Sequence, residues 1–399
     1  MELGIERFFK DSRWMKKIKG QRVALLAHPA SVDKDLRHSL DLFFSKKIRI
    51  FSAFGPQHGM LGDKQDNMIE SEDYMDPIYK IPVFSLYGKV RRPTEEMMST
   101  FDVIFIDLQD VGTRIYTYVT TLKYVLEEAT RFGKTVVVLD RPNPIGRPVE
   151  GTLLREGYES FVGAGPLPMR HGLTLGELAL WFKSYFRLDV DLHVVKMKAY
   201  FPEKKPGFGW PPQRTWINPS PNASHLNMAR CFPGTVLLEG THLSEGRGTT
   251  RPLEVVGAPG LLCQKILSEM EKIKPDWLKG AQYRLCHFLP MFQKHQGQIC
   301  SGIQIHADHE SYDHKKFKPY RWMALFFKVL KKVHPDFELW RDFHYEYEKD
   351  RLAIDLINGS SLLREWVDDS SAQTGDFEKI LVADEKKWTQ QRKTFLIYP

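Results

Sequence analysis

The sequence lacks the motifs on which several large enzyme classes depend. No Gly-x-Gly-x-x-Gly fingerprint opens the first strand-to-helix loop, and no Gly-x-x-x-x-Gly-Lys-Ser/Thr segment occurs, so the usual phosphate-binding loops of nucleotide enzymes are missing. The His-Glu-x-x-His motif of zinc proteases and the Gly-x-Ser-x-Gly elbow of serine hydrolases are missing too. We therefore expect an activity that needs neither a metal nor a cofactor.

Cysteine is scarce, with four residues in a chain of 399. No Cys-x-x-Cys pair or other zinc-ligand spacing occurs. This pattern indicates free, mostly buried thiols in a reducing compartment rather than a disulfide framework. The four residues are Cys231, Cys263, Cys286 and Cys300.

Long apolar runs are also absent. No stretch approaches the run of about 20 apolar residues that crosses a bilayer. The N-terminal residues show neither the apolar core nor the cleavage site of a secretory signal. We expect a cytoplasmic protein that does not bind membranes, and a homodimer is one alternative for its oligomeric state.

The charge is only mildly one-sided, at +7. Lysine and arginine are spread along the chain rather than gathered in arms, which argues against a nucleic-acid partner. A small anionic substrate is at least as compatible with this charge.

The first half of the chain alternates apolar strand-like runs with helix-like segments. Such alternation predicts a Rossmann-like, doubly wound parallel sheet. The length allows a second, smaller C-terminal α/β domain, and we expect the two domains at 1–226 and 229–399. The expected strands are 23–27, 48–54, 83–86, 103–107 and 135–139, and the expected helices are 36–45, one that opens at Thr94, and 118–132.

Beyond residue 150 the periodicity loosens, but some local signals remain. Thr174 and Glu177 have the spacing of a capping box, which predicts a helix over 174–186. A strand is expected at 192–197, and the segment 201–222 is so dense in proline and aromatic residues that it indicates a long ordered loop. The basic run at 315–334 carries apolar residues at helical spacing, which is typical of a helix with one solvated face.

Polar side chains follow several of the expected strands. Gln57 and His58 follow the second, Asp110 and Arg114 follow the strand at 103–107, and a loop rich in Arg, Asn and Pro follows 135–139. In an open α/β sheet, ligands bind beside the carboxyl ends of the strands. A role in tying the loops together is the alternative for each charged pair.

Other candidates lie in the middle of the chain. Glu150 stands beside a glycine near the same end of the sheet, with a solvated surface acid as the alternative. Arg170 and His171 precede a helix N-terminus, where an anion can bind. The segment 216–222 offers an aromatic platform and two amides suited to a sugar, and two glycines flank Arg247. Carboxylates, amides and aromatic rings together favour carbohydrate chemistry, in which paired acids act.

Taken together, these segments resemble one family, the bacterial NamZ-type exo-β-N-acetylmuramidases, over residues 20–399. The resemblance is carried by ALLAHPASVD, FGPQHGMLGD, PVFSLYG, RRPT, DLQDVGTRIYTYVTT, LDRPNPIG, VEG, SFVGAGPLPMRHGLTLGE, INPSPN, FPGTVLLEGTHLSEGRGTTRPLEVVGAP and residues 343–356. It implies a site in the cleft between the two domains, and release of N-acetylmuramic acid from the non-reducing end of peptidoglycan fragments, such as muropeptides or a disaccharide.

For this activity we expect three catalytic residues and a larger set that binds the sugar. The catalytic candidates are Glu150, Gln57 and His58, and the binding candidates are Asp63, Asp110, Arg114, Arg141, Asn143, Arg170, His171, Asn218, Asn222, Glu239, Glu245 and Arg247. Because their loops follow strand ends or glycine-rich turns, we expect Gln57, Asp110, Arg141, Glu150 and Arg247 to converge on one pocket.

The sequence departs from the family at one informative position. The family pattern is Pro-Glu-His-Gly where this chain has Pro56-Gln57-His58-Gly59, and an amide cannot act as a general acid or base. Two alternatives to a muramidase therefore stay open. One is a catalytically impaired sugar-binding or regulatory protein, and the other is a hydrolase of another amino sugar.

Overall fold

The N-terminal part is built on a seven-stranded sheet with the order β3-β4-β2-β1-β5-β6-β9. The computed structural model describes residues 1–66 and 68–399. Six of the strands run parallel, and only the edge strand β3 is antiparallel to its neighbour. The strands are β1 (Val23–Ala27), β2 (Ile50–Gly55), β3 (Tyr74–Met75), β4 (Pro82–Ser85), β5 (Val103–Asp107), β6 (Thr135–Leu139) and β9 (Asp191–Val195).

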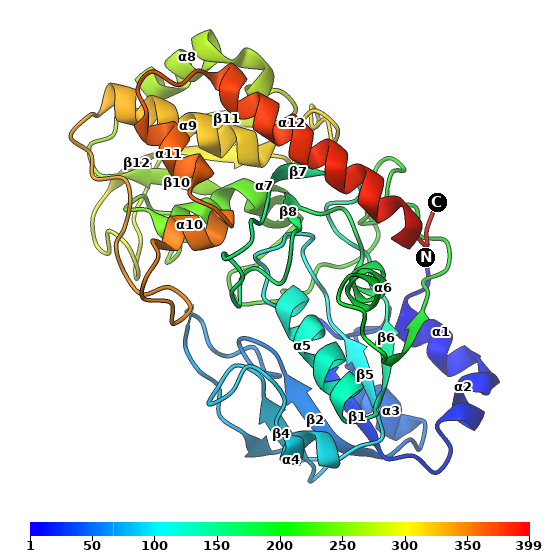
Figure 1. Ribbon diagram of the computed structural model, residues 1–399. Helices are drawn as coiled ribbons and strands as arrows, with labels where there is room; N and C mark the ends of the chain where they lie inside the picture. Colours follow the sequence, from blue (N-terminus) through cyan, green and yellow to red (C-terminus); the bar gives the residue numbers. More distant parts are fainter. Residues whose placement is uncertain (67) are drawn as a thin grey trace.

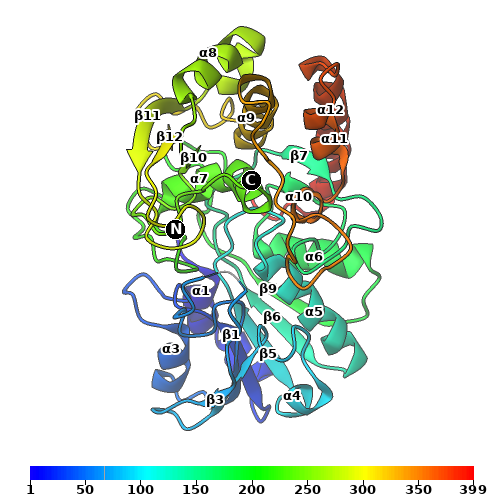
Figure 2. The same ribbon diagram turned by 90° about the vertical axis from the view of Figure 1, so that its left-hand side faces the viewer.

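Helices cover both faces of this sheet, as Figures 1 and 2 show. Alternate strand residues point to opposite faces, so Leu25 packs in one apolar cluster while its neighbour Ala24 packs in the other. The first cluster contains α1 (Gly4–Lys10) and α3 (Ser39–Ser45). The second contains α4 (Glu95–Ser99), α5 (Tyr118–Arg131) and α6 (Leu175–Tyr185). The expected doubly wound architecture is therefore confirmed.

The C-terminal part is smaller and lies against the end of the sheet where the parallel strands finish (Figure 1). It contains a three-stranded antiparallel sheet, β10-β12-β11, and the buried helix α9 (Pro319–Val333). Its strands are β10 (Val255–Ala258), β11 (Gln282–Phe288) and β12 (Cys300–His306), and its other helices are α7 (Leu226–Thr235), α8 (Cys263–Ile273), α10 (Ala353–Asn358), α11 (Leu362–Asp368) and α12 (Thr374–Gln391).

The C-terminus returns to the N-terminal sheet and ties the two parts together. Helix α12 packs on the short strand β7 (Glu150–Leu153), which pairs with β8 (Pro168–Arg170). The hydroxyl of Tyr398 donates to Asp140 at 2.6 Å and accepts from the amide of Met197 at 2.9 Å. The two chain ends consequently lie close together in Figure 1.

Most of the expected elements are present, and one differs for a local reason. Strands occur at 23–27, 103–107 and 135–139, and Thr174 and Glu177 form the predicted capping box. The helix expected at 36–45 begins only at Ser39, because Leu36 has a φ of 62° and Asp33 binds the amides of Asp35 and Arg37 in a turn. The segment 201–222 contains turns but no helix or strand, as expected.

Candidate active site

A small cavity of about 50 Å³ lies where the two parts of the chain meet. The N-terminal part contributes loops that follow β2 and β5 together with the segment near residue 220, and the C-terminal part contributes α7 and later loops. The polar residues that line the cavity are Gln57, His58, Tyr116, Thr117, Ser220, Asn222, Glu239, Arg247, Tyr345 and Glu346.

The loop after β2 brings an amide and an imidazole to the cavity. The side-chain oxygen of Gln57 accepts a hydrogen bond from the hydroxyl of Thr117 at 2.7 Å, and Thr117 precedes α5. His58 has a φ of 70°, which turns the chain sharply. Its Nδ1 lies 2.8 Å from the carbonyl oxygen of Lys64, and burial lowers the pKa of His58 to about 4. The imidazole is therefore neutral at physiological pH.

A buried ion pair forms the opposite wall. Glu239 lies on the short helix η1 (Val236–Gly240), and its Oε1 accepts from Nη2 of Arg247 at 2.6 Å while its Oε2 accepts from the hydroxyl of Tyr345 at 2.7 Å. Gly246 and Gly248 flank the arginine with φ values of 78° and 81°. A Cβ at Gly248 would lie 2.6 Å from the backbone nitrogen of Phe292, so both glycines serve the path of the loop.

A second carboxylate stands behind this pair. Oε1 of Glu245 lies 3.2 Å from Nε of Arg247, and its Oε2 lies 2.7 Å from Nζ of Lys294. The charges of Lys294 and Arg247 lower the pKa of Glu245 against the opposing effect of its burial. Arg247 is thus held between two carboxylates, which fixes the direction of its guanidinium.

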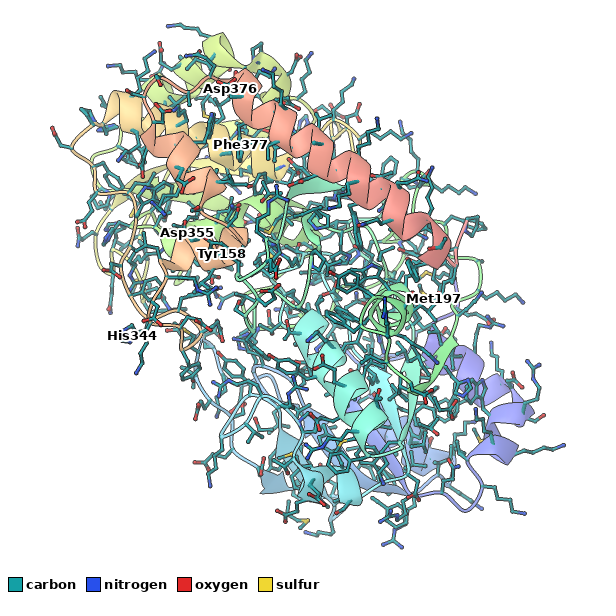
Figure 3. All side chains as sticks on the ribbon, in the orientation of Figure 1. Tyr158, Met197, His344, Asp355, Asp376 and Phe377 are labelled. Atoms are coloured by element: carbon teal, nitrogen blue, oxygen red, sulfur yellow. The ribbon has the colours of Figure 1, made fainter. Side chains whose placement is uncertain are left out.

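Residues 341–352, which we call the strap, reach from the C-terminal part to the N-terminal sheet. Figure 1 shows this orange segment crossing to the loops after β2 and β4, and Figure 3 labels His344 within it. The strap is held by contacts to both sides: Arg341 donates its amide to Gly240, and Tyr347 donates its hydroxyl to Glu70 at 3.0 Å. It places Tyr345 and Glu346 in the wall of the cavity.

Glu346, on the strap, adds a carboxyl group to the cavity wall. Both of its oxygens lie 3.0 Å from the hydroxyl of Tyr87, which donates to them. Burial and the nearby charge of Glu239 raise the pKa of Glu346 to about 7, although hydrogen bonds from Tyr87 and Gln57 and the charge of Arg91 act in the opposite direction.

The backbone at this point is strained. Glu346 has a φ of 48° and Tyr347 a φ of 68°, so two consecutive residues with side chains adopt the left-handed region. Each such residue costs of the order of 1 kcal/mol and persists only where its surroundings enforce it. The contacts of the strap on both sides of the cavity supply that enforcement.

The comparisons with known proteins agree over the whole chain. Residues 23–227 match the family described as "Exo-beta-N-acetylmuramidase NamZ, N-terminal", and residues 230–398 match the corresponding C-terminal family. The peptidoglycan β-N-acetylmuramidase NamZ of Bacillus subtilis strain 168 is 36% identical over 403 residues, which cover 100% of this chain and 91% of that protein.

The chain belongs to the NamZ exo-β-N-acetylmuramidase family. It is accordingly a glycosidase. A crystal structure of a DUF1343 family protein from Bacteroides fragilis superposes with a TM-score of 0.84 at 28% identity, covering 100% of this chain and 99% of the other. A second such structure from the same organism, at a TM-score of 0.73, 24% identity and coverage of 100% and 98%, shows the same fold.

Five of the residues predicted for the NamZ site line the cavity: Gln57, His58, Asn222, Glu239 and Arg247. Asn222 donates its amide to the carbonyl of Gln65 at 2.8 Å, which connects the segment 216–222 to the loop after β2. Glu245 contacts the site through Arg247.

Glu150 lies elsewhere, and the expectation that it shares a pocket with Gln57 is wrong. It is fully buried on β7, where its Oε1 accepts from the amide of Arg321 at 2.9 Å. Arg321 also binds Glu378 and Glu385 of helix α12. The strand β7 pairs with β8 and is not part of the main sheet. For this reason Glu150 does not lie at the ligand-binding end of that sheet, although it follows β6 closely in the sequence.

Arg141 and Asp110 likewise do not line the cavity, which corrects the expected convergence. Arg141 forms a buried pair with Asp107 at the end of β5, with Nε to Oδ1 at 2.6 Å. Asp110 accepts from the amide of Gly112 at 2.7 Å and lies 3.6 Å from Nε2 of His171. These charged groups contact one another across neighbouring loops, but Oδ1 of Asp110, Nη1 of Arg141 and Nε2 of His171 are buried without a hydrogen-bond partner among the described residues.

The remaining predicted residues also hold loops in place. Asn143 accepts from the amide of Ile145 and donates to Leu173, and Arg170 donates to the carbonyl of Ile145 at 2.6 Å. Arg114 donates to the carbonyls of Ile357 and Asn358 at 2.9 Å and so joins the two parts of the chain.

The last two predicted residues, Asp63 and Asn218, also lie outside the cavity lining. Asp63 is solvent-exposed and pairs with Lys64 at 2.8 Å. Asn218, with its amide nitrogen facing inward, donates to the carbonyls of Ala223 and Ser224.

Sequence reasoning missed the strap residues. Glu346 and Tyr345 lie within a segment that carries the resemblance to the NamZ family, yet neither was singled out. They could have been identified from their residue types, because Tyr-Glu-Tyr-Glu occurs at 345–348. The hydrophobic periodicity gives no such indication, since this stretch has neither a helix pattern nor a strand pattern.

In the described part of the chain, residues 1–66 and 68–399, no group of three or more His, Cys, Asp or Glu side chains is placed to hold a metal ion. Within the same residues, no helix has both the length and the apolar character needed to cross a membrane.

Proposed function

We propose that this protein hydrolyses the glycosidic bond of a terminal β-N-acetylmuramic acid residue in peptidoglycan fragments, with Glu346 as the general acid. The observation that carries the proposal is a buried carboxyl group with a pKa of about 7 in the wall of a cavity shared by both halves of the chain. A general acid works best when its pKa lies near the working pH.

The second carboxylate in the cavity wall has another task. Both oxygens of Glu239 already accept short hydrogen bonds, one from Arg247 and one from Tyr345. A carboxylate held in this way is poorly placed to attack a sugar. The arrangement therefore favours a scheme in which one protein acid suffices and the 2-acetamido group of the substrate is the nucleophile, an established exception to the two-carboxylate mechanism.

In this scheme, Glu346 donates its proton to the glycosidic oxygen as the bond from that oxygen to the anomeric carbon breaks. The acetamido oxygen forms a bond to the anomeric carbon and closes a cyclic intermediate. Water then attacks the same carbon, the ring opens, and the Glu346 carboxylate takes up the proton of the water. Gln57 acts as a positioning residue, because it bridges Thr117 and Glu346.

Arg247 supplies the recognition of muramic acid. It is the only arginine or lysine among the described residues that line the cavity. The lactyl ether of muramic acid ends in a carboxylate, and a fixed guanidinium is the side chain best suited to bind one.

The reaction is tested by turnover of a chromogenic β-N-acetylmuramide, with a chromogenic β-N-acetylglucosaminide beside it. We expect turnover of the muramide and a clear preference for it. Binding of N-acetylmuramic acid without turnover of either glycoside would instead indicate the catalytically impaired sugar-binding protein that Gln57 raises as the second candidate.

Replacement of Gln57 by glutamate separates the two candidates. If Glu346 is the acid, Gln57→Glu removes a hydrogen bond that lowers the pKa of Glu346 and adds a negative charge that raises it. We expect the alkaline limb of the kcat/KM profile to move upward by about one pH unit, with a change of less than about tenfold at the optimum.

Kinetics of both forms across the pH range decide the matter, and Asn222→Asp serves as a control that adds a charge to another position of the same wall. A rise of about 10²-fold or more in Gln57→Glu would show that the wild-type chain is impaired by its missing glutamate and that Glu346 is not the acid.

We also propose that the enzyme works in the cytoplasm on fragments taken up by the cell. All four cysteines are free thiols, and three of them are buried. This is the pattern of a reducing compartment.

A further inference from the structure

A second cavity, of about 530 Å³, adjoins the candidate active site. It lies between helix α5, the end of α6, the loop 159–166 and the strap. Among the residues that the structure describes, Glu346 is the one that lines both cavities. The carboxyl group proposed as the acid therefore stands at the boundary between two binding spaces.

We propose that this second cavity binds the leaving-group sugar, the ring on the other side of the bond that is cleaved. The inference rests on the proposed function, because a general acid must reach the oxygen that joins two sugars, and the rings must then extend to opposite sides of it. The muramic acid lies on the Arg247 side of Glu346, and the second cavity, on the other side, receives the uncharged sugar that departs.

The aromatic lining of the second cavity fits a sugar ring. Tyr185 is stacked on Trp181 with ring centres 4.9 Å apart, yet it is 51% exposed. Tyr347 has the guanidinium of Arg91 4.1 Å from its ring centre and is 52% exposed. Each ring is thus supported from within the protein and still accessible where it lines the cavity. Supported, accessible aromatic faces are suited to the C–H-rich face of a pyranose.

Most of the charged side chains around this cavity are paired, and Glu159 and Glu346 add two carboxyl groups that have no salt-bridge partner within the described part of the chain. Arg91 pairs with Glu70 at 3.3 Å, Lys123 with Glu127 at 2.7 Å, and Glu348 with Arg351 at 2.9 Å. These pairs differ from the Arg247 site, where one arginine is held between the two carboxylates of Glu239 and Glu245. A neutral sugar fits this setting better than an anionic peptide, since the latter would compete with an existing ion pair.

The test compares a substrate that fills the second cavity with one that cannot. A disaccharide with β-linked N-acetylmuramic acid at its non-reducing end carries a leaving-group sugar, whereas β-N-acetylmuramyl fluoride releases a single atom. We expect Tyr185→Ala to lower kcat/KM about tenfold on the disaccharide and to leave it unchanged on the fluoride. Tyr185→Phe, which keeps the ring, should behave as the wild type, as should Phe201→Ala, a control at a half-exposed aromatic outside both cavities.

Equal losses on both substrates, or no loss on the disaccharide, would overturn the assignment. Binding of the intact disaccharide, measured by calorimetry with wild type and Tyr185→Ala, separates this failure from that of the proposed function. The wild type could cleave neither substrate and still bind the disaccharide more tightly than the Tyr185→Ala variant does. That result would support the sugar-binding site and refute the proposed hydrolase activity. Equal binding by the two forms refutes the sugar site.

Discussion

Glu346→Gln is expected to lower kcat/KM on a β-N-acetylmuramyl disaccharide by about 10²–10⁴-fold, the usual cost of losing a general acid. The substitution keeps the size of the side chain and its ability to accept a hydrogen bond from Tyr87, so the fold should persist. The loss should depend on the leaving group, because a sugar alcohol needs a proton to depart and a nitrophenolate does not. On a nitrophenyl muramide we expect a loss of less than about tenfold.

Glu150→Gln is the matched control for this experiment. Glu150 is also a buried glutamate with a pKa raised by burial, but it lies on β7 outside the cavity. Its substitution should leave kcat/KM on both substrates within a few-fold of the wild type. A large loss of kcat/KM in Glu150→Gln, together with an unchanged kcat/KM in Glu346→Gln, would identify Glu150 as the general acid and refute the assignment of Glu346.

Arg247→Met is expected to abolish the preference for muramic acid. Hydrogen bonds to charged groups contribute about 1.5–3 kcal/mol, and a tenfold change in affinity corresponds to about 1.4 kcal/mol. We therefore expect kcat/KM on a chromogenic muramide to fall by roughly 10–10²-fold, while kcat/KM on the matching glucosaminide, which has no lactyl carboxylate, changes little.

Lys294→Met controls for the loss of a buried cation. Lys294 pairs with the same Glu245 that contacts Arg247, but it does not line the cavity. Both variants leave a buried carboxylate with one partner fewer, so both should lower the melting temperature. Only Arg247→Met should change the ratio of the two substrates. An equal fall in kcat/KM on the muramide and the glucosaminide would show that Arg247 stabilises the site without binding the lactyl carboxylate.

The sequence predicted the sheet well because its signals are local. The apolar runs that became β1, β5 and β6 are short and uninterrupted, and the capping box at Thr174 needs only residues three apart. The strand-end rule also placed Gln57 and His58 correctly at the meeting point of the two halves. In each case the deciding residues are neighbours in the chain.

The site was predicted less completely because its residues are brought together by contacts between segments that are far apart in the sequence. Arg141 and Asp107 lie at the strand ends as expected, yet nothing in their local sequence indicates that they bind each other instead of a ligand. Glu346 reaches Gln57 and Tyr87 only because the strap crosses between the two parts, over separations of 289 and 259 residues. Glu150 looked suitable from its neighbours, but β7 leaves the edge of the sheet.

The central claim, that Glu346 must be protonated for catalysis, is tested most directly by the pH dependence of kcat/KM on the disaccharide. Because the protonated form is the active one and its pKa is raised to about 7, activity should fall as the pH rises through about 7, and Glu346→Gln should lose that limb. Measurements from about pH 5 to about pH 9 cover the transition. A wild-type profile that stays level through neutrality, or a limb that persists in Glu346→Gln, would contradict the account.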